Sequence, residues 1–245
     1  MYIQYRMGVK GIIEKQLWKL NPISNEIDYV ELFYEMNEKL SNNLFVTFYF
    51  SSTIKDVDEA ENITRPLLDD LINLMIYKFN AIFDKPIINS HNIEEKVLIA
   101  RGSITLYKQK QHVLNEQDYT WLSTKINDQH LVTKLKLNTH FLQYKSILSI
   151  EDDIARFLLL YGLLYEMQGC SQRNVDQYIK SEDSNVKMLT TTRPNSNSQE
   201  TIYTWWRNQA QHIQTTTDIE QVTEEFRNLV NSLNELVFKA IENEL

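Results

Sequence analysis

The fold of the C-terminal half is decided by one stretch, Glu200-Thr-Ile-Tyr-Thr-Trp-Trp-Arg-Asn-Gln-Ala-Gln-His212. Within it, Arg207, Asn208 and His212 have the spacing R-N-x-x-x-H. Arginine carries a permanent positive charge on a planar group of donors that fits a phosphate, and histidine exchanges protons near neutral pH. Asn208 adds an amide that can hydrogen-bond to both. Such a set can cleave a phosphodiester without a metal, because it supplies a proton carrier and a cation for the charge that grows in the transition state.

Long helical patterns lie on both sides of this stretch. Residues 152–165 keep one apolar face between Ser149, a candidate N-cap, and Gly169, a candidate stop signal. The last helix is predicted to run to the C-terminus, with an apolar stripe formed by Ile219, Val222, Phe226, Leu229, Val230, Leu233, Leu236, Val237 and Ile241.

Shorter helices are predicted at residues 134–148 and 172–180. The polar residues 181–199 predict a loop that is long for a compact domain. The helix that carries the motif is expected to begin at Gln199, with Ser198 as its cap. These patterns together predict an all-α bundle in this half of the chain.

The run Tyr203-Thr-Trp-Trp-Arg-Asn208, followed by His212 and a long amphipathic helix, resembles the HEPN superfamily (higher eukaryotes and prokaryotes nucleotide-binding domain), in particular its Apea-like or MauJ-like branch. The resemblance covers roughly the last 110 residues, the scale of a small domain. It implies a helical domain with a metal-independent ribonuclease site that two protomers often complete. Its catalytic residues would be Arg207, Asn208 and His212. The run Arg173-Asn-Val-Asp-Gln-Tyr178 has the same spacing but ends in tyrosine, and we interpret it as helix surface.

The expected reaction is attack of the RNA 2′-hydroxyl on the neighbouring phosphate. His212 would move the proton, Arg207 would hold the non-bridging oxygens, and Asn208 would orient the histidine or the phosphate. The substrate would be single-stranded RNA, since DNA lacks the nucleophile. No cofactor and no metal are expected: the other histidines lack the close paired spacing of zinc ligands.

On a straight helix, Arg207 and His212 point roughly 140° apart, because they are five residues apart at 3.6 residues per turn. Either the helix bends, or Arg207 reaches around it, or a second chain completes the pair. A two-fold dimer would bring both copies of the motif to one axis. We therefore expect a homodimer.

The aromatic residues before Arg207 have two interpretations. Tyr203 and Trp206 could stack on unpaired bases beside the phosphate. Ile202, Trp205 and Trp206 could equally form the buried face of the helix, which is the more common role of aromatics at helical spacing.

The motif itself has a purely structural alternative, in which Arg207 pairs with Glu200 or Glu224 and His212 ends a helix. Two functions therefore stay open. One is a ribonuclease effector, as in a toxin or an antiviral defence protein, acting with an antitoxin or sensor partner. The other is a non-catalytic HEPN-like module for dimerisation or nucleotide binding.

The first half predicts a mixed α+β domain of residues 1–133, a sensor or partner-binding part, before a helical domain of residues 134–245. The expected fold class is α+β. A strand pair is predicted at residues 2–13, turning near Gly8 and Gly11. Further strands are predicted at 43–50, 87–88 and 97–107, and a helix at 58–80 with Pro66 in its first turns or at a kink.

Composition excludes several classes. The net charge is −8 and each half contributes −4, with 14 Lys+Arg against 18 Asp+Glu before residue 134 and 11 against 15 after it. Neither half is a basic nucleic-acid module, so RNA would have to meet a local cluster. A single cysteine, Cys170, excludes an internal disulfide. With no apolar signal segment and no run long enough to span a bilayer, we expect a cytoplasmic protein without a membrane partner.

Overall fold

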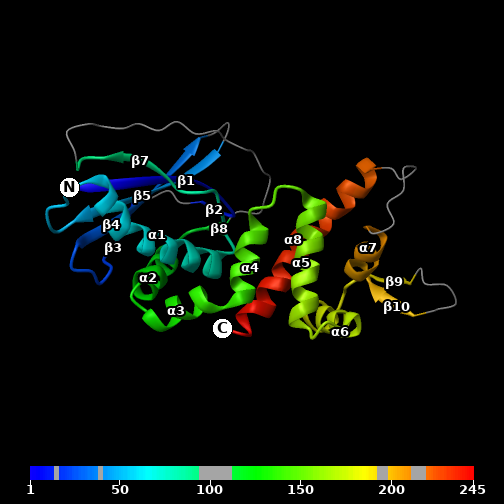
Figure 1. The fold of residues 1–245 in the computed structure, drawn as a ribbon. Coiled ribbons are helices and arrows are strands. Elements are labelled where there is room, and N and C mark those ends of the chain that lie inside the picture. Colours follow the sequence, from blue (N-terminus) through cyan, green and yellow to red (C-terminus); the bar gives the residue numbers. More distant parts are fainter. Residues whose placement is uncertain (14–16, 38–40, 94–111, 192–197, 211–218) are drawn as a thin grey trace. The chain divides into compact units, whose positions relative to one another are not determined.

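The computed structural model describes residues 1–13, 17–37, 41–93, 112–191, 198–210 and 219–245, and it divides into two compact units, Met1–Leu137 and Asn138–Leu245 (Figure 1). The fold class is α+β, as predicted: antiparallel strands form the sheet of the first unit and helices dominate the second. The expected boundary between residues 133 and 134 lies inside a helix, α3 (Gln129–Leu137), which belongs to the first unit.

The first unit is built on one antiparallel sheet. Its strands are β1 (Tyr2–Lys10), β3 (Trp18–Leu20), β4 (Ile27–Asn37), β5 (Ser41–Phe50), β6 (Ile82–Phe83) and β7 (Ile87–His91). The order is β3-β4-β5-β1-β6, and β7 also pairs with β1. Along β1 every second side chain is buried, namely Ile3, Tyr5, Met7 and Val9. This period of two directs one face of the sheet into the core.

The predicted strand pair at residues 2–13 was wrong in part. Gly8 lies within β1, opposite Asn43 of β5, and the side chain of Asp84 occupies the space where a Cβ would stand. The chain bends only at Gly11, whose φ of +89° suits glycine. The residues after it form β2 (Ile12–Ile13), which pairs in parallel with β8 (His112–Val113). The predicted strand at 97–107 lies outside the described residues.

The buried face of the sheet packs on α1 (Val57–Phe79), which confirms the helix predicted at 58–80. Asp56 caps its first turn, and Asn80 ends it with a φ of +51°. The hydroxyl groups of Tyr5 and Thr64 lie 2.8 Å apart, so this contact joins the sheet to the helix. Beside α1 lie α2 (Glu116–Lys125) and α3.

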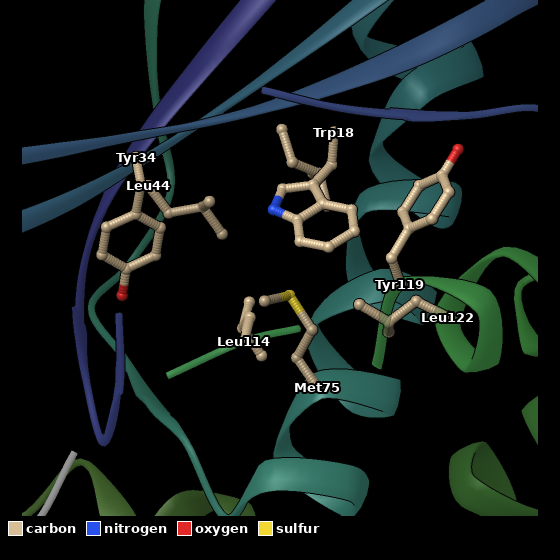
Figure 2. A pocket seen from close by; sticks show the side chains of 8 residues that line it. Trp18, Tyr34, Leu44, Met75, Leu114, Tyr119 and Leu122 are labelled. Carbon is tan, nitrogen blue, oxygen red and sulfur yellow. The ribbon is translucent and has the colours of Figure 1, made fainter. Parts of the chain in front are cut away.

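A small cavity remains between the sheet and these helices (Figure 2). Its volume is about 10 Å³. The lining is apolar apart from the indole nitrogen of Trp18 and the hydroxyl groups of Tyr34 and Tyr119. The lining residues are Trp18, Leu32, Tyr34, Leu44, Met75, Leu114, Tyr119 and Leu122. Such a space holds at most one water molecule. It is therefore a packing feature of the core and has no room for an organic ligand.

The second unit contains the helices α4 (Thr139–Leu148), α5 (Asp153–Met167), α6 (Gln172–Glu182), α7 (Ile202–Ala210) and α8 (Ile219–Glu242). The pair α5 and α8 forms its centre, where the rings of Phe157 and Phe226 meet edge to face with centroids 4.8 Å apart. The predicted helix at 134–148 is divided at Asn138, the N-cap of α4. The N-cap of α5 is Asp152, which replaces the expected Ser149.

The second unit also contains a feature that the sequence did not predict. Two strands pair antiparallel: β9 (Met188–Thr190), within the predicted loop, and β10 (Gln199–Thr201), where the motif helix was expected to begin. The unit is therefore helical with a small sheet, and the prediction of an all-α bundle was wrong on this point. In the described part of the chain, no helix is long and apolar enough to cross a membrane.

Candidate functional site

The motif stretch enters the second unit as a strand and then turns into a helix. The expectation that the helix begins at Gln199 under a Ser198 cap was wrong, because β10 runs from Gln199 to Thr201 and α7 follows it directly. The hydroxyl oxygen of Thr201 accepts the backbone N–H of Thr204 at 3.4 Å. Thr201 thus takes the capping role that the sequence had assigned to Ser198.

Asp176 of α6 holds the corner between β10 and α7. Its Oδ1 accepts the backbone N–H of Thr201 at 3.0 Å and the hydroxyl groups of Thr201 and Thr204 at 2.7 Å each. The Thr204 hydroxyl also lies 2.8 Å from the hydroxyl of Tyr161 on α5. Both threonines are fully buried, so these hydrogen bonds act where the local dielectric is low. They fix the start of α7 and, with it, the direction of the motif side chains.

Arg207 and Asn208 lie together on α7, and a chain of hydrogen bonds holds them. An Nη1–H of Arg207 donates to Oδ1 of Asn208 at 3.1 Å, and Nδ2 of Asn208 donates to Oε2 of Glu200 at 3.3 Å. The same Oε2 accepts Nε2 of Gln172 at 3.1 Å. Glu200 is only 3% exposed, whereas Arg207 and Asn208 are half-buried. A buried carboxylate therefore positions an accessible guanidinium through a neutral amide.

Arg207 has no direct ion-pair partner in the described part of the chain. It forms no ion pair there with Glu200 or with Glu224, whose ion-pair partner is Arg227 at 3.0 Å. The direct ion pair of the structural alternative is therefore absent among the described residues, and Arg207 is linked to Glu200 through the amide of Asn208. The guanidinium carbon lies 5.9 Å from the centre of the Tyr161 ring, within the range of a cation–π contact.

Tyr161 stays a neutral hydroxyl beside this cation. Burial raises the pKa of Tyr161 to about 12, and the charges of Asp176 and Glu200 act in the same direction. The hydrogen bond with Thr204 and the charge of Arg207 oppose the shift and do not cancel it. The ring is therefore a fixed, uncharged support at neutral pH.

The other predicted site residues differ in placement. His212 lies outside the described residues, so its role stays a prediction. Tyr203 is 4% exposed, and burial raises its pKa while a hydrogen bond to Ser232 opposes that shift. This position belongs to the core and leaves no ring face for a base. Trp206 is partly exposed and meets the rings of Trp205 and Phe226 with centroids 5.0 and 5.4 Å apart.

An open groove of about 380 Å³ has Glu200 in its wall. We call it the α6 groove. Its walls come from one face of α6 and from β9 and β10, which lie next to one another in Figure 1. The lining residues are Gln172, Arg173, Asp176, Gln177, Lys180, Met188, Thr191, Ser198, Gln199 and Glu200. The run beginning at Arg173, interpreted from sequence as plain helix surface, thus forms one wall of a groove.

Sequence reasoning missed the two acids that organise this region. Glu200 was considered only as an ion-pair partner, and Asp176 only as part of the second R-N-x-x-x run. A usable signal was the spacing of Arg173, Gln177 and Lys180, which places three polar side chains on one face of a helix. The burial of Glu200 and the hydrogen bonds of Asp176 depend on tertiary contacts and leave no local pattern in the sequence.

Among the residues that the structure describes, no group of three His, Cys, Asp or Glu side chains is placed to hold a metal ion. Comparison of the chain with family models, with curated proteins and with solved structures found no match.

Proposed function

We propose that the second unit is a HEPN-type, metal-independent endoribonuclease that cleaves single-stranded RNA. The observation that carries this proposal is the guanidinium of Arg207, which is accessible, free of ion pairs among the described residues, and oriented by Asn208 on the buried Glu200. An oriented, uncompensated cation is what a scissile phosphate needs, because negative charge grows on its oxygens during cleavage.

In the proposed reaction the 2′-hydroxyl attacks the adjacent phosphorus while His212 accepts its proton. The P–O5′ bond breaks, the protonated His212 passes the proton to the departing 5′-oxygen, and the products are a 2′,3′-cyclic phosphate and a 5′-hydroxyl. Arg207 stabilises the non-bridging oxygens and Asn208 keeps the guanidinium in place. The first unit would act as a sensor or partner-binding part, and the whole chain as a toxin-like or antiviral effector in the cytoplasm.

The test is incubation of the full chain with single-stranded RNA in EDTA, followed by analysis of the product ends. We expect cyclic-phosphate ends, and a loss of about 100-fold or more in rate for Arg207→Ala and for His212→Ala. The cleavage rate of Arg207→Lys should lie between those of the wild type and Arg207→Ala, since lysine keeps the charge but loses the planar donors. Arg227→Ala is the charge-matched control and should cleave like the wild type. An inert wild-type chain would contradict the nuclease and favour a non-catalytic binding module.

The proposed homodimer is tested by mixing two inactive variants. If Arg207 of one protomer works with His212 of the other, a mixed dimer of Arg207→Ala and His212→Ala holds one intact site. Activity should then return to about a quarter of the wild-type value after subunit exchange, because half of the dimers are mixed and each has one working site of two. Absence of recovery in a verified mixed dimer would place both residues of each site in one chain.

A further inference from the structure

A single residue separates two helices that belong to different units. Helix α3 ends at Leu137, the last residue of the first unit, and α4 begins at Thr139 in the second unit. Asn138 between them is extended, with a φ of −72° and a ψ of 111°, and its Oδ1 accepts the backbone N–H of Phe141 at 2.6 Å. The break between the helices therefore depends on one residue and its capping hydrogen bond.

The local sequence favours one continuous helix across this break. Residues 134–148 have a helical pattern, and a single helix was predicted there. Leu137, Phe141, Tyr144 and Leu148 follow one another by four, three and four residues, which is the spacing of one stripe along a helix. The last three are buried in the second unit, whereas Leu137 is 74% exposed. The break thus leaves the first member of the stripe in solvent.

A continuous helix through the break would not disturb the core of either unit. At about 100° per residue, the buried residues of α3, Val132 and Leu135, fall on roughly the opposite side of such a helix from Phe141 and Tyr144. Helix α3 would keep its apolar face in the first unit and α4 would keep its own in the second. Leu137 falls on the side of the α4 stripe, away from the buried face of α3.

We infer that Asn138 is a hinge between two states of the chain. In the observed state Asn138 caps α4, and in the second state α3 and α4 form one helix and Leu137 joins the stripe of α4. Burial of a leucine and added backbone hydrogen bonds favour the second state, whereas the cap favours the first. The hinge decides whether α3 and α4 turn independently or as one rod. The inference does not depend on cleavage of RNA by the second unit.

Distances between two spin labels separate the two states. His130 on α3 and Ser146 on α4 are exposed, so labels on His130→Cys/Ser146→Cys, in a Cys170→Ser chain, report the angle between the helices. Along one straight helix these positions lie about 24 Å apart, and a bend shortens the distance. With Asn138 intact we expect mainly the shorter distance. Asn138→Ala should shift the distribution to about 24 Å, because alanine removes the cap and favours a helix. An unchanged distribution would overturn the inference.

Three further variants serve as controls in the same labelled chain. Asn138→Asp keeps a capping oxygen and should keep the shorter distance. Asp152→Ala removes the cap of α5 and should also keep it, which separates the hinge from the loss of any cap. Leu137→Gln added to Asn138→Ala keeps the helix propensity but places a polar group on the stripe, so the shorter distance should return. A shift that survives Leu137→Gln would reject the second state as described. Circular dichroism confirms that each variant is folded.

Amide hydrogen exchange provides a second readout in the unlabelled full chain. In the observed state the N–H groups of Thr139 and His140 belong to the first turn of α4, where a helix has no carbonyl partners for them. In one continuous helix they donate to carbonyls four residues earlier, in α3. We therefore expect Asn138→Ala to slow the exchange of these two amides about tenfold or more, and Asn138→Asp to leave it unchanged. Exchange in Asn138→Ala as fast as in the wild type would overturn the inference.

Discussion

The two units bury their polar atoms in different ways. In the first unit, β1 and β5 direct apolar side chains inward, and the buried carboxylates are paired one at a time: Asp70 with the ammonium group of Lys136 at 2.7 Å, and Asp118 with the backbone N–H of Asn115 at 3.0 Å. In the second unit, the corner of α6, β10 and α7 places the carboxylates of Asp176 and Glu200 among buried hydroxyl and amide groups.

The difference separates stability from positioning. Apolar packing stabilises a fold while tolerating exchange of one hydrophobic group for another of similar size. A hydrogen-bonded corner fixes the direction in which the helix and its side chains leave it, because each donor and acceptor must stay paired. In the second unit, the hydrogen-bonded polar groups lie next to Arg207 and hold it in place. Four predictions test the contrast between apolar packing in the first unit and hydrogen bonding at this corner.

The largest expected effect is in the apolar core of the first unit. Phe48 is 1% exposed, and Phe48→Ala should lower the free energy of unfolding by about 3–5 kcal/mol, through lost burial and the cavity left behind. Urea denaturation, monitored by hydrogen exchange in peptides from each unit, measures this loss of stability. Phe33, which is 48% exposed on β4, supplies the control: Phe33→Ala should cost under about 1 kcal/mol. Equal losses would show that the sheet is covered on both faces.

The next effect is at the corner of the second unit. Asp176→Ala removes the acceptor for three donors on Thr201 and Thr204, two residues that are fully buried. We expect a loss of about 2–3 kcal/mol, because unpaired buried donors cost about 1–3 kcal/mol each and water relieves part of this. Asp176→Asn keeps one acceptor oxygen and should lose less. Full hydrogen-exchange protection of the 201–204 backbone in Asp176→Ala would contradict the assigned role.

A third effect appears at alkaline pH. The pKa of Tyr161 is about 12 in the folded unit, against 10.0 for an ordinary tyrosine. Above pH 10 the unfolded chain releases this proton while the folded chain retains it, so stability falls as pH rises from 10 to 12, by about 2 kcal/mol in total. Denaturation midpoints measured at pH 9, 10 and 11 should show the decline. The decline in stability with pH should be smaller in Tyr161→Phe. An identical slope in both proteins would refute the assignment of this effect to Tyr161.

The smallest effect is expected at Glu200. Glu200→Gln should change the free energy of unfolding by less than about 1 kcal/mol, since it removes a buried charge that has no cationic partner among the described residues and keeps an acceptor for Gln172 and Asn208. Glu200→Ala removes that acceptor and should cost more. Thermal unfolding compares Glu200→Gln with Glu200→Ala. If the two variants were equally unstable, the negative charge of Glu200 itself would stabilise the corner of α6, β10 and α7.

The regular elements of both units could be predicted because their signals are local. The aromatic and β-branched residues of 43–50 and the helical spacing at 58–80 each match an observed element, β5 and α1. The fold class follows from such segments. Caps were less predictable: Asp152, and not Ser149, begins α5, although both are good capping residues and lie within one turn of each other.

The candidate site could be predicted only in part. The spacing of Arg207 and Asn208 marked the stretch, and the structure places the two side chains in contact. The sequence could not predict that β9 and β10 pair, since three-residue strands carry almost no periodic signal. Nor could it predict the burial of Tyr203 and Glu200 around the corner, because tertiary contacts decide which side chains of short elements turn inward.

The linkage of Arg207 to Glu200 through a neutral amide has a consequence for binding in salt. In a chain of net charge −8, the cation assigned to the proposed RNA strand is Arg207 on α7. A single phosphate contact on single-stranded RNA would release few counterions, giving a slope of roughly −0.7 for the logarithm of the binding constant against the logarithm of salt concentration. Recognition would then depend on fit at short range, and RNA would remain bound at ionic strengths that strip it from a basic protein.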